Sequence, residues 1–201
     1  MEIKFRDKEL KAEAAKHGLA LGIIVWVLSL VFSYVMLSSS SFWVVVLVMP
    51  VLISFLIPVV SSIFLSIDLR KKIGGYWDLR KATSGIFIMF LVAFILHTGL
   101  QTFFVKVVEP NWSEKVVTSV ADATHDMMLK QGVDKNEINK KVDDLKKGFE
   151  QKNSNSIGKT IQGYFINLIF LFVFAFFLAL IFKRNNPNPF AGQANDQFEN
   201  N

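Results

Sequence analysis

Four long segments without any Asp, Glu, Lys or Arg limit what this chain can fold into. They cover residues 18–37, 43–66, 84–105 and 160–182, and each holds 20 or more mostly apolar residues. A helix rises about 1.5 Å per residue, so about 20 residues cross the roughly 30 Å of hydrocarbon in a bilayer. We therefore predict an all-α integral membrane protein with four transmembrane helices, called spans 1 to 4 in chain order.

The basic residues indicate how the spans are oriented. Twelve of the 22 Lys and Arg residues, including all four arginines, lie in residues 1–17, in the 67–83 loop and at the start of the 183–201 tail, whereas the 38–42 connection carries no charge. The 107–158 segment holds eight lysines together with nine acidic residues, and such a long loop constrains orientation only weakly. The positive-inside rule therefore predicts that both termini and the 67–83 loop lie in the cytoplasm. Because the net charge of +5 is sorted by topology, it favours anionic lipid headgroups over nucleic acid as a partner. The predicted headgroup contacts are Arg70, Lys71, Lys72, Arg80 and Lys81.

Each segment outside the spans has its own prediction. Residues 1–17 mix both signs of charge with a few apolar side chains, which is typical of a cytoplasmic interfacial helix. The 107–158 segment is predicted to form an extracytoplasmic hairpin of helices near 113–131 and 134–150, which leans on the bundle, the membrane or a partner. We expect its inward face to comprise Val116, Val120, Met127, Ile138, Val142, Leu145 and Phe149. The Asn-rich 183–201 tail is predicted to be disordered in the cytoplasm.

Small residues and prolines mark two of the spans. In span 1, Gly18 and Gly22 form a small-xxx-small pattern, which indicates close helix packing within the bundle or in a dimer. In span 2, Pro50 and Pro58 each remove a backbone donor, so we expect a kinked helix whose proline face points into the bundle. A static kink is favoured over a moving hinge.

Three polar side chains interrupt spans 3 and 4 at similar depth. His97 and Gln101 are four residues apart and share one helix face, and Asn167 lies about as far below the same predicted surface. Hydrocarbon offers no hydrogen-bond partners, so we predict an intramembrane polar cluster of these three residues. Interhelical hydrogen bonding is the favoured interpretation of this cluster, and a binding or proton-handling site centred on His97 is the alternative.

The order of several motifs resembles a known family. The segment LRKKIGGYWDLRKA (Leu69–Ala82) precedes span 3, VVEPNW (Val107–Trp112) follows it, and a charged helical insert leads to a last span that ends in KRN. In this succession, roughly residues 15–185 resemble bacterial four-span membrane proteins grouped as domain of unknown function 4199. The resemblance implies the cytoplasmic (inner) membrane of Gram-negative bacteria, with residues 107–158 in the periplasm. It implies no activity and no functional residue.

No catalytic motif is present. The chain has no cysteine, no phosphate-binding loop and no charged residue within a span, so neither a catalytic residue nor a cofactor is predicted. Asp122, His125 and Asp126 share one helix face, but two carboxylates and one imidazole are more typical of a solvated face than of a metal site. No metal site is predicted.

Two classes of function remain from the sequence. The favoured hypothesis is a small non-enzymatic accessory or scaffolding subunit of a membrane complex, with a membrane-protein partner or a second copy of this chain. The alternative is a small transporter or lipid-handling protein that uses a polar face of spans 2–4.

Overall fold

The computed structural model describes residues 2–153 and 157–184, and nearly all of this range is helical. Four helical segments are long and apolar enough to cross a membrane, which confirms the prediction of an all-α protein with four spans. These segments are Asp7–Leu37, Trp43–Lys72, Leu79–Val108 and Gln162–Phe182.

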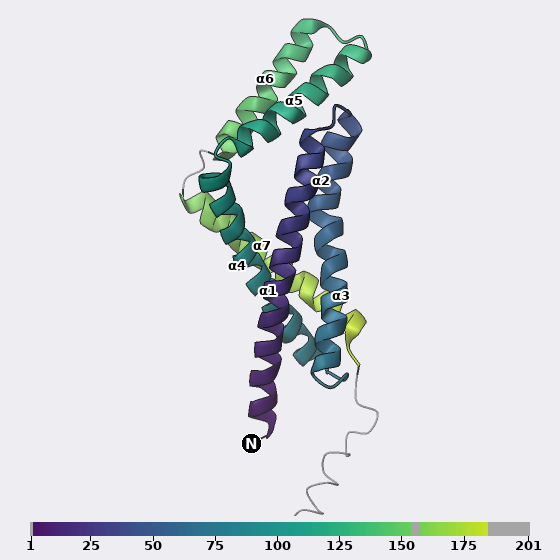
Figure 1. The fold of residues 1–201 in the computed structure, drawn as a ribbon, viewed down its shortest axis with the longest axis vertical. Coiled ribbons are helices and arrows are strands. Elements are labelled where there is room, and N and C mark those ends of the chain that lie inside the picture. The colour runs from purple at the N-terminus through teal and green to yellow at the C-terminus, as the bar shows by residue number, and fades with distance from the viewer. Residues whose placement is uncertain (1, 154–156, 185–201) are drawn as a thin grey trace, which may run out of the picture.

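Ten helical elements build these spans and the hairpin between spans 3 and 4 (Figure 1). Span 1 belongs to α1 (Glu2–Leu37), and span 3 comprises α4 (Leu79–Phe103) and the π-helical turn η3 (Phe104–Val108). Span 2 comprises η1 (Trp43–Val48), α2 (Met49–Val51), η2 (Leu52–Leu56) and α3 (Ile57–Lys72). The hairpin is α5 (Trp112–Lys130) and α6 (Lys135–Asn153), and span 4 is α7 (Ile157–Phe182).

Helix α1 runs without interruption from the segment predicted to be a cytoplasmic interfacial helix into span 1. No proline or glycine lies between Glu2 and His17, so nothing breaks the helical hydrogen bonds before span 1 begins. Leu10 and Ala14 are also buried in the main apolar core. Residues 2–17 therefore form the first part of the α1 helix, which leads directly into span 1, and a position at the cytoplasmic interface stays a prediction.

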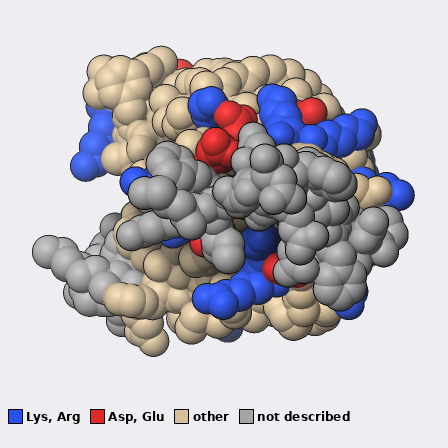
Figure 2. All heavy atoms as spheres, turned by 90° about the horizontal axis from the view of Figure 1, so that it is seen from below, with Lys and Arg blue, Asp and Glu red and all other residues tan. Residues whose placement is uncertain are grey.

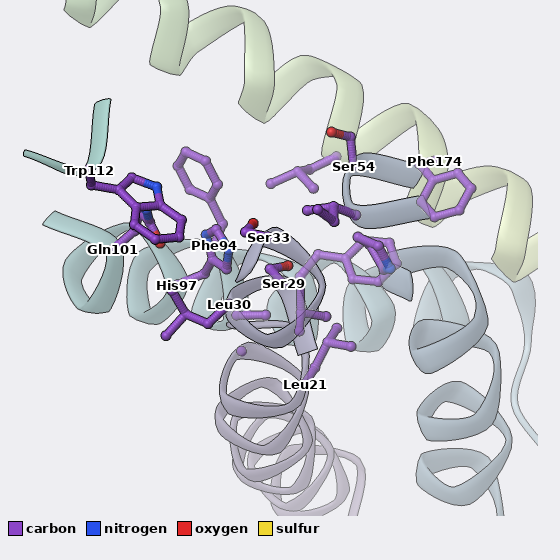
Figure 3. Close-up of a pocket in the computed structure, with 17 residues that line it drawn as sticks. Leu21, Ser29, Leu30, Ser33, Ser54, Phe94, His97, Gln101, Trp112 and Phe174 are labelled. Atoms are coloured by element: carbon purple, nitrogen blue, oxygen red, sulfur yellow. The ribbon is translucent and has the colours of Figure 1, made fainter. Parts of the chain in front are cut away.

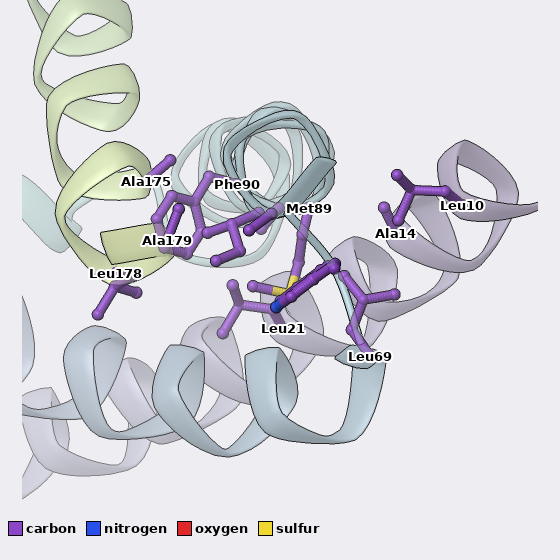
Figure 4. Packing of buried hydrophobic residues seen from close by; sticks show 13 residues of the cluster. Leu10, Ala14, Leu21, Leu69, Met89, Phe90, Ala175, Leu178 and Ala179 are labelled. Carbon is purple, nitrogen blue, oxygen red and sulfur yellow. The ribbon is translucent and has the colours of Figure 1, made fainter. Parts of the chain in front are cut away.

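The main core lies where α1, α3, α4 and α7 meet. Figure 4 shows Leu21 of α1, Leu69 of α3, Phe90 of α4 and Ala175 of α7 converging on it. Many other large apolar side chains are exposed on the outside of the bundle. This distribution is expected for a protein surrounded by lipid.

Gly18 and Gly22 allow α1 and α4 to approach closely. A Cβ atom added to Gly18 would lie 2.6 Å from the Met89 carbonyl oxygen, and one added to Gly22 would lie 3.1 Å from the Ala93 carbonyl oxygen. The small-xxx-small pattern thus serves packing within the bundle, one of the two alternatives that the sequence left open.

The loop between α3 and α4 holds the end of α7. Trp77 and Arg184 exchange backbone hydrogen bonds of 3.0 and 3.1 Å, and the Trp77 Nε1–H donates to the Phe182 carbonyl oxygen at 3.0 Å. The carbonyls in the last turn of a helix lack partners within the helix, so this bond satisfies one of them. Gly74 and Gly75 have φ angles of 99° and 80°, which lets the chain turn into this contact.

Helices α5 and α6 form a hairpin that leans on the ends of spans 1 and 2. Ile138 is fully buried, and the other six residues expected on the inward face are all partly buried. Val116 and Val120 pack against a small cluster formed by Met36, Val45 and Ala123. Part of the apolar surface of the hairpin is therefore buried against the bundle. The small core between its two helices could not bury that surface alone.

Basic side chains lie at the end of the molecule where the N-terminus is found. Figure 2 views the molecule from the end at which the N-terminus lies, and Lys and Arg side chains are spread around this end. The last turn of α3 contributes Arg70, Lys71 and Lys72. The hairpin lies beyond the opposite ends of α1 and η1.

Candidate intramembrane binding site

Each proline of span 2 follows a π-helical turn. In η1, before Pro50, and in η2, before Pro58, the helix widens so that a backbone N–H bonds the carbonyl five residues earlier, as from Met49 to Val44 and from Ile57 to Leu52. A proline has no N–H and its ring clashes with the carbonyl four residues back, so a wider turn relieves that clash. The second of these turns places Ile53, Ser54 and Pro58 beside a cavity.

A cavity of about 380 Å³ lies among the four spans, within the membrane-crossing part of the bundle. Span 1 contributes one wall, η2 and α3 a second, α4 a third and α7 a fourth, and Trp112 at the start of α5 also lines it. Figure 3 shows Gln101 and Trp112 toward one end of this cavity and Phe174 toward the other. Apart from a few polar groups, its walls are aliphatic and aromatic, which is the usual composition of a ligand-binding cavity.

The polar side chains reach the cavity in pairs that follow the helix period. His97 and Gln101 of α4 are four residues apart, as are Ser29 and Ser33 of α1, so each pair lies on one helix face. Ser54 adds a third hydroxyl from η2. Two of the three residues in the predicted polar cluster thus line one cavity.

None of these five side chains forms a hydrogen bond with another group in the described part of the chain. Some hydroxyls elsewhere in the spans bond to their own helix, as Ser62 Oγ–H does to the Val59 carbonyl and Thr102 Oγ1–H to the Thr98 carbonyl, both at 2.8 Å, whereas the buried Ser66 hydroxyl, outside the cavity, also lacks a partner among the described residues. The polar groups of the cavity therefore keep their hydrogen-bonding capacity for something other than the surrounding helices.

An aromatic cluster lies beside the cavity next to the hairpin. The Trp112 ring makes edge contacts with Phe104 and Tyr34, with ring centroids 5.2 and 5.1 Å apart, and Phe104 in turn contacts Trp26 at 6.4 Å. Trp112 is only 7% exposed. The sequence pattern predicts no role for Trp112, although tryptophan at the end of a span is a general signal for a position at the membrane interface.

Asn167 does not join His97 and Gln101 at the cavity. It is exposed on α7, it is absent from the cavity wall, and a Cβ atom added to the nearby Gly163 would meet nothing within 4 Å. At this level α4 and α7 meet instead through Phe94 and Tyr164, whose ring centroids are 6.0 Å apart. The predicted cluster of three polar residues is therefore reduced to His97 and Gln101 at the cavity.

Comparison with known proteins identifies the family of this chain. The family model described as "Protein of unknown function (DUF4199)" matches residues 16–184, which include all the residues of the cavity wall. The chain belongs to the DUF4199 family. No curated protein and no solved structure matches it. The family description assigns no activity, so the function of this DUF4199 protein has to be argued from its own side chains.

Outside the cavity, a polar contact between His17 and Asp68 joins α1 to α3 in this DUF4199 protein. His17 is 4% exposed, its Nε2 lies 2.9 Å from Asp68 Oδ2, and its Nδ1 lies 2.7 Å from the Glu13 carbonyl oxygen. Lys72 also contacts Asp68 Oδ2, at 3.3 Å. No local pattern in the sequence marks Asp68, 51 positions further along the chain, as the partner of His17.

Two of the five predicted headgroup residues also bond within the protein. Lys72 contacts Asp68, and the Arg70 Nη1–H donates to the Phe182 carbonyl at 3.4 Å. Lys71 and Arg80 are exposed and Lys81 is half-buried. Headgroup contact therefore stays a prediction for this set of residues.

The acidic face of α5 carries no cluster of potential metal ligands. His125 Nδ1 lies 3.5 Å from Asp126 Oδ1, and Asp122 and Asp126 are both exposed. Among the described residues, no group of three or more His, Cys, Asp and Glu side chains is arranged to hold a metal ion.

Proposed function

We propose that this DUF4199 protein binds an amphiphile of the bilayer in its intramembrane cavity, as a lipid-handling protein or small transporter does. The observation that carries the proposal is that five polar side chains face one largely apolar cavity without a partner in the described protein: Ser29, Ser33, Ser54, His97 and Gln101. An apolar cavity with a few convergent polar groups is the usual form of a small-molecule site.

The energetics of polar groups in a membrane support binding over interhelical hydrogen bonding. A polar group transferred from water to an apolar medium without a hydrogen bond costs about 2–7 kcal/mol, depending on the reference state. If His97 and Gln101 served to join helices, each should bond to a neighbouring helix, but neither has such a bond in the described residues. A bound amphiphile with a polar group would supply the missing partners.

We further propose that the protein lies in the bacterial inner membrane with both termini in the cytoplasm and the hairpin in the periplasm. Basic side chains around the N-terminal end of the molecule support this orientation, as does the uncharged 38–42 connection at the opposite end. The cavity would then extend through the middle of the spans and reach the periplasmic end of the bundle at Trp112.

A scaffolding role in a membrane complex is a second candidate, supported by the outer surface of α7. Phe165, Phe170 and Ile181 are 64%, 68% and 71% exposed, and α7 packs mainly on α4. In a bilayer such a surface is covered either by lipid or by the span of another protein. Co-purification of a stoichiometric membrane-protein partner that depends on Phe170 would favour this role.

Retention of a lipid by the purified protein tests the proposed function. The protein is extracted from its native membrane into polymer-bounded nanodiscs, and the retained lipids are identified by mass spectrometry. We expect one amphiphile to be enriched over its share of the bulk membrane, and Ser33→Phe, which fills the cavity, to abolish the enrichment. Val27→Phe is the matched control, since Val27 is also on α1 but is 44% exposed and lies outside the cavity wall. A wild-type lipid composition equal to that of the bulk membrane would contradict the proposal.

A further inference from the structure

We infer that the amphiphile bound in this cavity has an uncharged polar group, a hydroxyl or a carbonyl, and a single chain or ring system. This inference rests on the proposed function and adds the chemical class of the ligand. It follows from three properties of the cavity: its lack of charge, the hydrogen-bonding character of its polar groups, and its size.

The cavity wall includes no Asp, Glu, Lys or Arg. A charged headgroup drawn into it would lose its hydration without meeting an opposite charge, and an unpaired ion in a low-dielectric medium is far more costly than a neutral polar group. The basic side chains that suit a phosphate lie instead at the far end of α3 and the start of α4. An anionic phospholipid headgroup therefore fits that end of the molecule and not the cavity.

The polar groups of the wall both donate and accept hydrogen bonds. Each serine hydroxyl does so, as does the Gln101 amide, and a neutral imidazole at His97 has one nitrogen of each kind. Because the two pairs come from α1 and α4, a polar atom between these helices can be reached from both sides. A ketone, ester or quinone-like carbonyl accepts from such a set, and a hydroxyl both accepts from it and donates to it.

The apolar part of the cavity limits the size of the ligand. Phe90, Phe94, Leu171 and Phe174 form the wall on the α4 and α7 side. The space within the wall is about 380 Å³ and is partly open to the surroundings. The cavity itself therefore takes up one chain or one ring system, and a second chain of a phospholipid would lie outside its wall.

A series of probes that differ only in the headgroup tests the inference. The wild-type protein is reconstituted in phosphatidylcholine nanodiscs and titrated with brominated single-chain amphiphiles of one chain length. Their headgroups are a hydroxyl, a methyl ketone, a carboxylate and a trimethylammonium. Bromine quenches nearby tryptophan fluorescence, and Trp112 lies in the cavity wall. The Trp112→Phe protein identifies the part of the quenching that comes from the cavity.

We expect saturable quenching by the hydroxyl and ketone probes at about 10-fold lower concentration than by the two charged probes, a difference of about 1.4 kcal/mol. Charged probes that bind equally well or better would overturn the inference on the headgroup and leave the proposed function standing. No saturable quenching by any probe would overturn both.

A variant locates the preference in the polar groups of the wall. The double substitution His97→Leu with Gln101→Leu should remove most of the roughly 10-fold preference for uncharged headgroups, because it deletes the hydrogen bonds on the α4 side. Thr102→Val is the matched control, since Thr102 follows Gln101 but is exposed and bonds to its own helix. An unchanged preference in a folded double variant would contradict the assignment of these two residues. If the double variant does not fold, the probe series on the wild-type protein still decides the inference.

Discussion

At the scale of single residues, His17 shows how a polar group can be buried at the edge of a membrane span. Both of its ring nitrogens face oxygen atoms, one a carbonyl and one a carboxylate. A carbonyl can only accept, so both contacts are hydrogen bonds only if both nitrogens carry a hydrogen or if Asp68 does. The contact joins residues 51 positions apart and thereby links α1 to α3.

Replacing His17 should therefore loosen the N-terminal end of the bundle. We expect His17→Leu to lower the midpoint of thermal unfolding, because the substitution leaves Asp68 without its partner on α1. Scanning fluorimetry of the detergent-solubilised protein measures this midpoint. His125→Leu is the control, since His125 lies on the hairpin and is 43% exposed. Equal midpoints for the two variants would show that the His17 contact does not stabilise the bundle.

At the scale of elements, hydropathy and helix signals predict most of what the structure contains. Spans of about 20 apolar residues are recognisable because backbone hydrogen bonds in lipid have to be satisfied within a helix. Gly132, which ends α5 with a φ of 74°, and Asp134, whose carboxylate accepts from the Asn136 N–H, are local signals that the sequence carries in full. The prolines of span 2 and the absence of proline and glycine between Glu2 and His17 are local features that fit the turns η1 and η2 and the continuous α1 helix, but the prediction did not include these details.

The close contact between α1 and α4 gives a test at this scale. We expect Gly18→Ala to destabilise the protein by about 1–3 kcal/mol, because the new methyl group would press on the backbone of α4. Gly99→Ala should be neutral or stabilising by up to about 1 kcal/mol, since Gly99 has open space around it and alanine favours the helix. Unfolding in a denaturing detergent series compares the two. A Gly18→Ala protein as stable as the wild type would contradict the close approach.

The hairpin gives a second test. Ile138 is fully buried on α6, so Ile138→Asp would place a carboxylate in the contact between α5 and α6. We expect limited proteolysis of the hairpin to become at least about 10-fold faster, because a buried unpaired charge costs several kcal/mol and local opening exposes cleavage sites. Asn139→Asp is the matched control, since the neighbouring Asn139 is exposed. Equal cleavage rates for the two variants would show that Ile138 is wrongly placed in the contact.

At the scale of the whole molecule, the sequence predicts where the spans lie along the chain better than it predicts which spans and side chains pack against each other. His97 and Gln101 share a cavity because they share a helix face, which the spacing of four residues already indicates. Asn167 is at a similar distance from the end of its span, but depth alone does not say which way a side chain points or how two helices cross. The cavity itself depends on four helices at once, so its serines and Trp112 could be assembled only from the structure.

Orientation in the membrane is testable at this scale because the chain has no cysteine. Single cysteines at Ser40, Ser119 and Gly75 are treated with a membrane-impermeant thiol reagent on intact spheroplasts. We expect labelling at Ser40 and Ser119 and none at Gly75, because basic residues near Gly75 favour the cytoplasm. Labelling of all three after permeabilisation is the control for reactivity. The opposite pattern on intact cells would reverse the proposed orientation.

Crosslinking from inside the cavity tests most directly whether the cavity holds a ligand in the membrane. A photoreactive benzoylphenylalanine replaces Phe94, which lines the cavity, or Phe170, which lies outside its wall and is 68% exposed on α7. After irradiation of native membranes, mass spectrometry identifies what is attached at each position. We expect one dominant amphiphile with an uncharged polar group at Phe94 and a mixture of bulk lipids at Phe170. The same mixture at both positions would contradict a ligand site in the cavity.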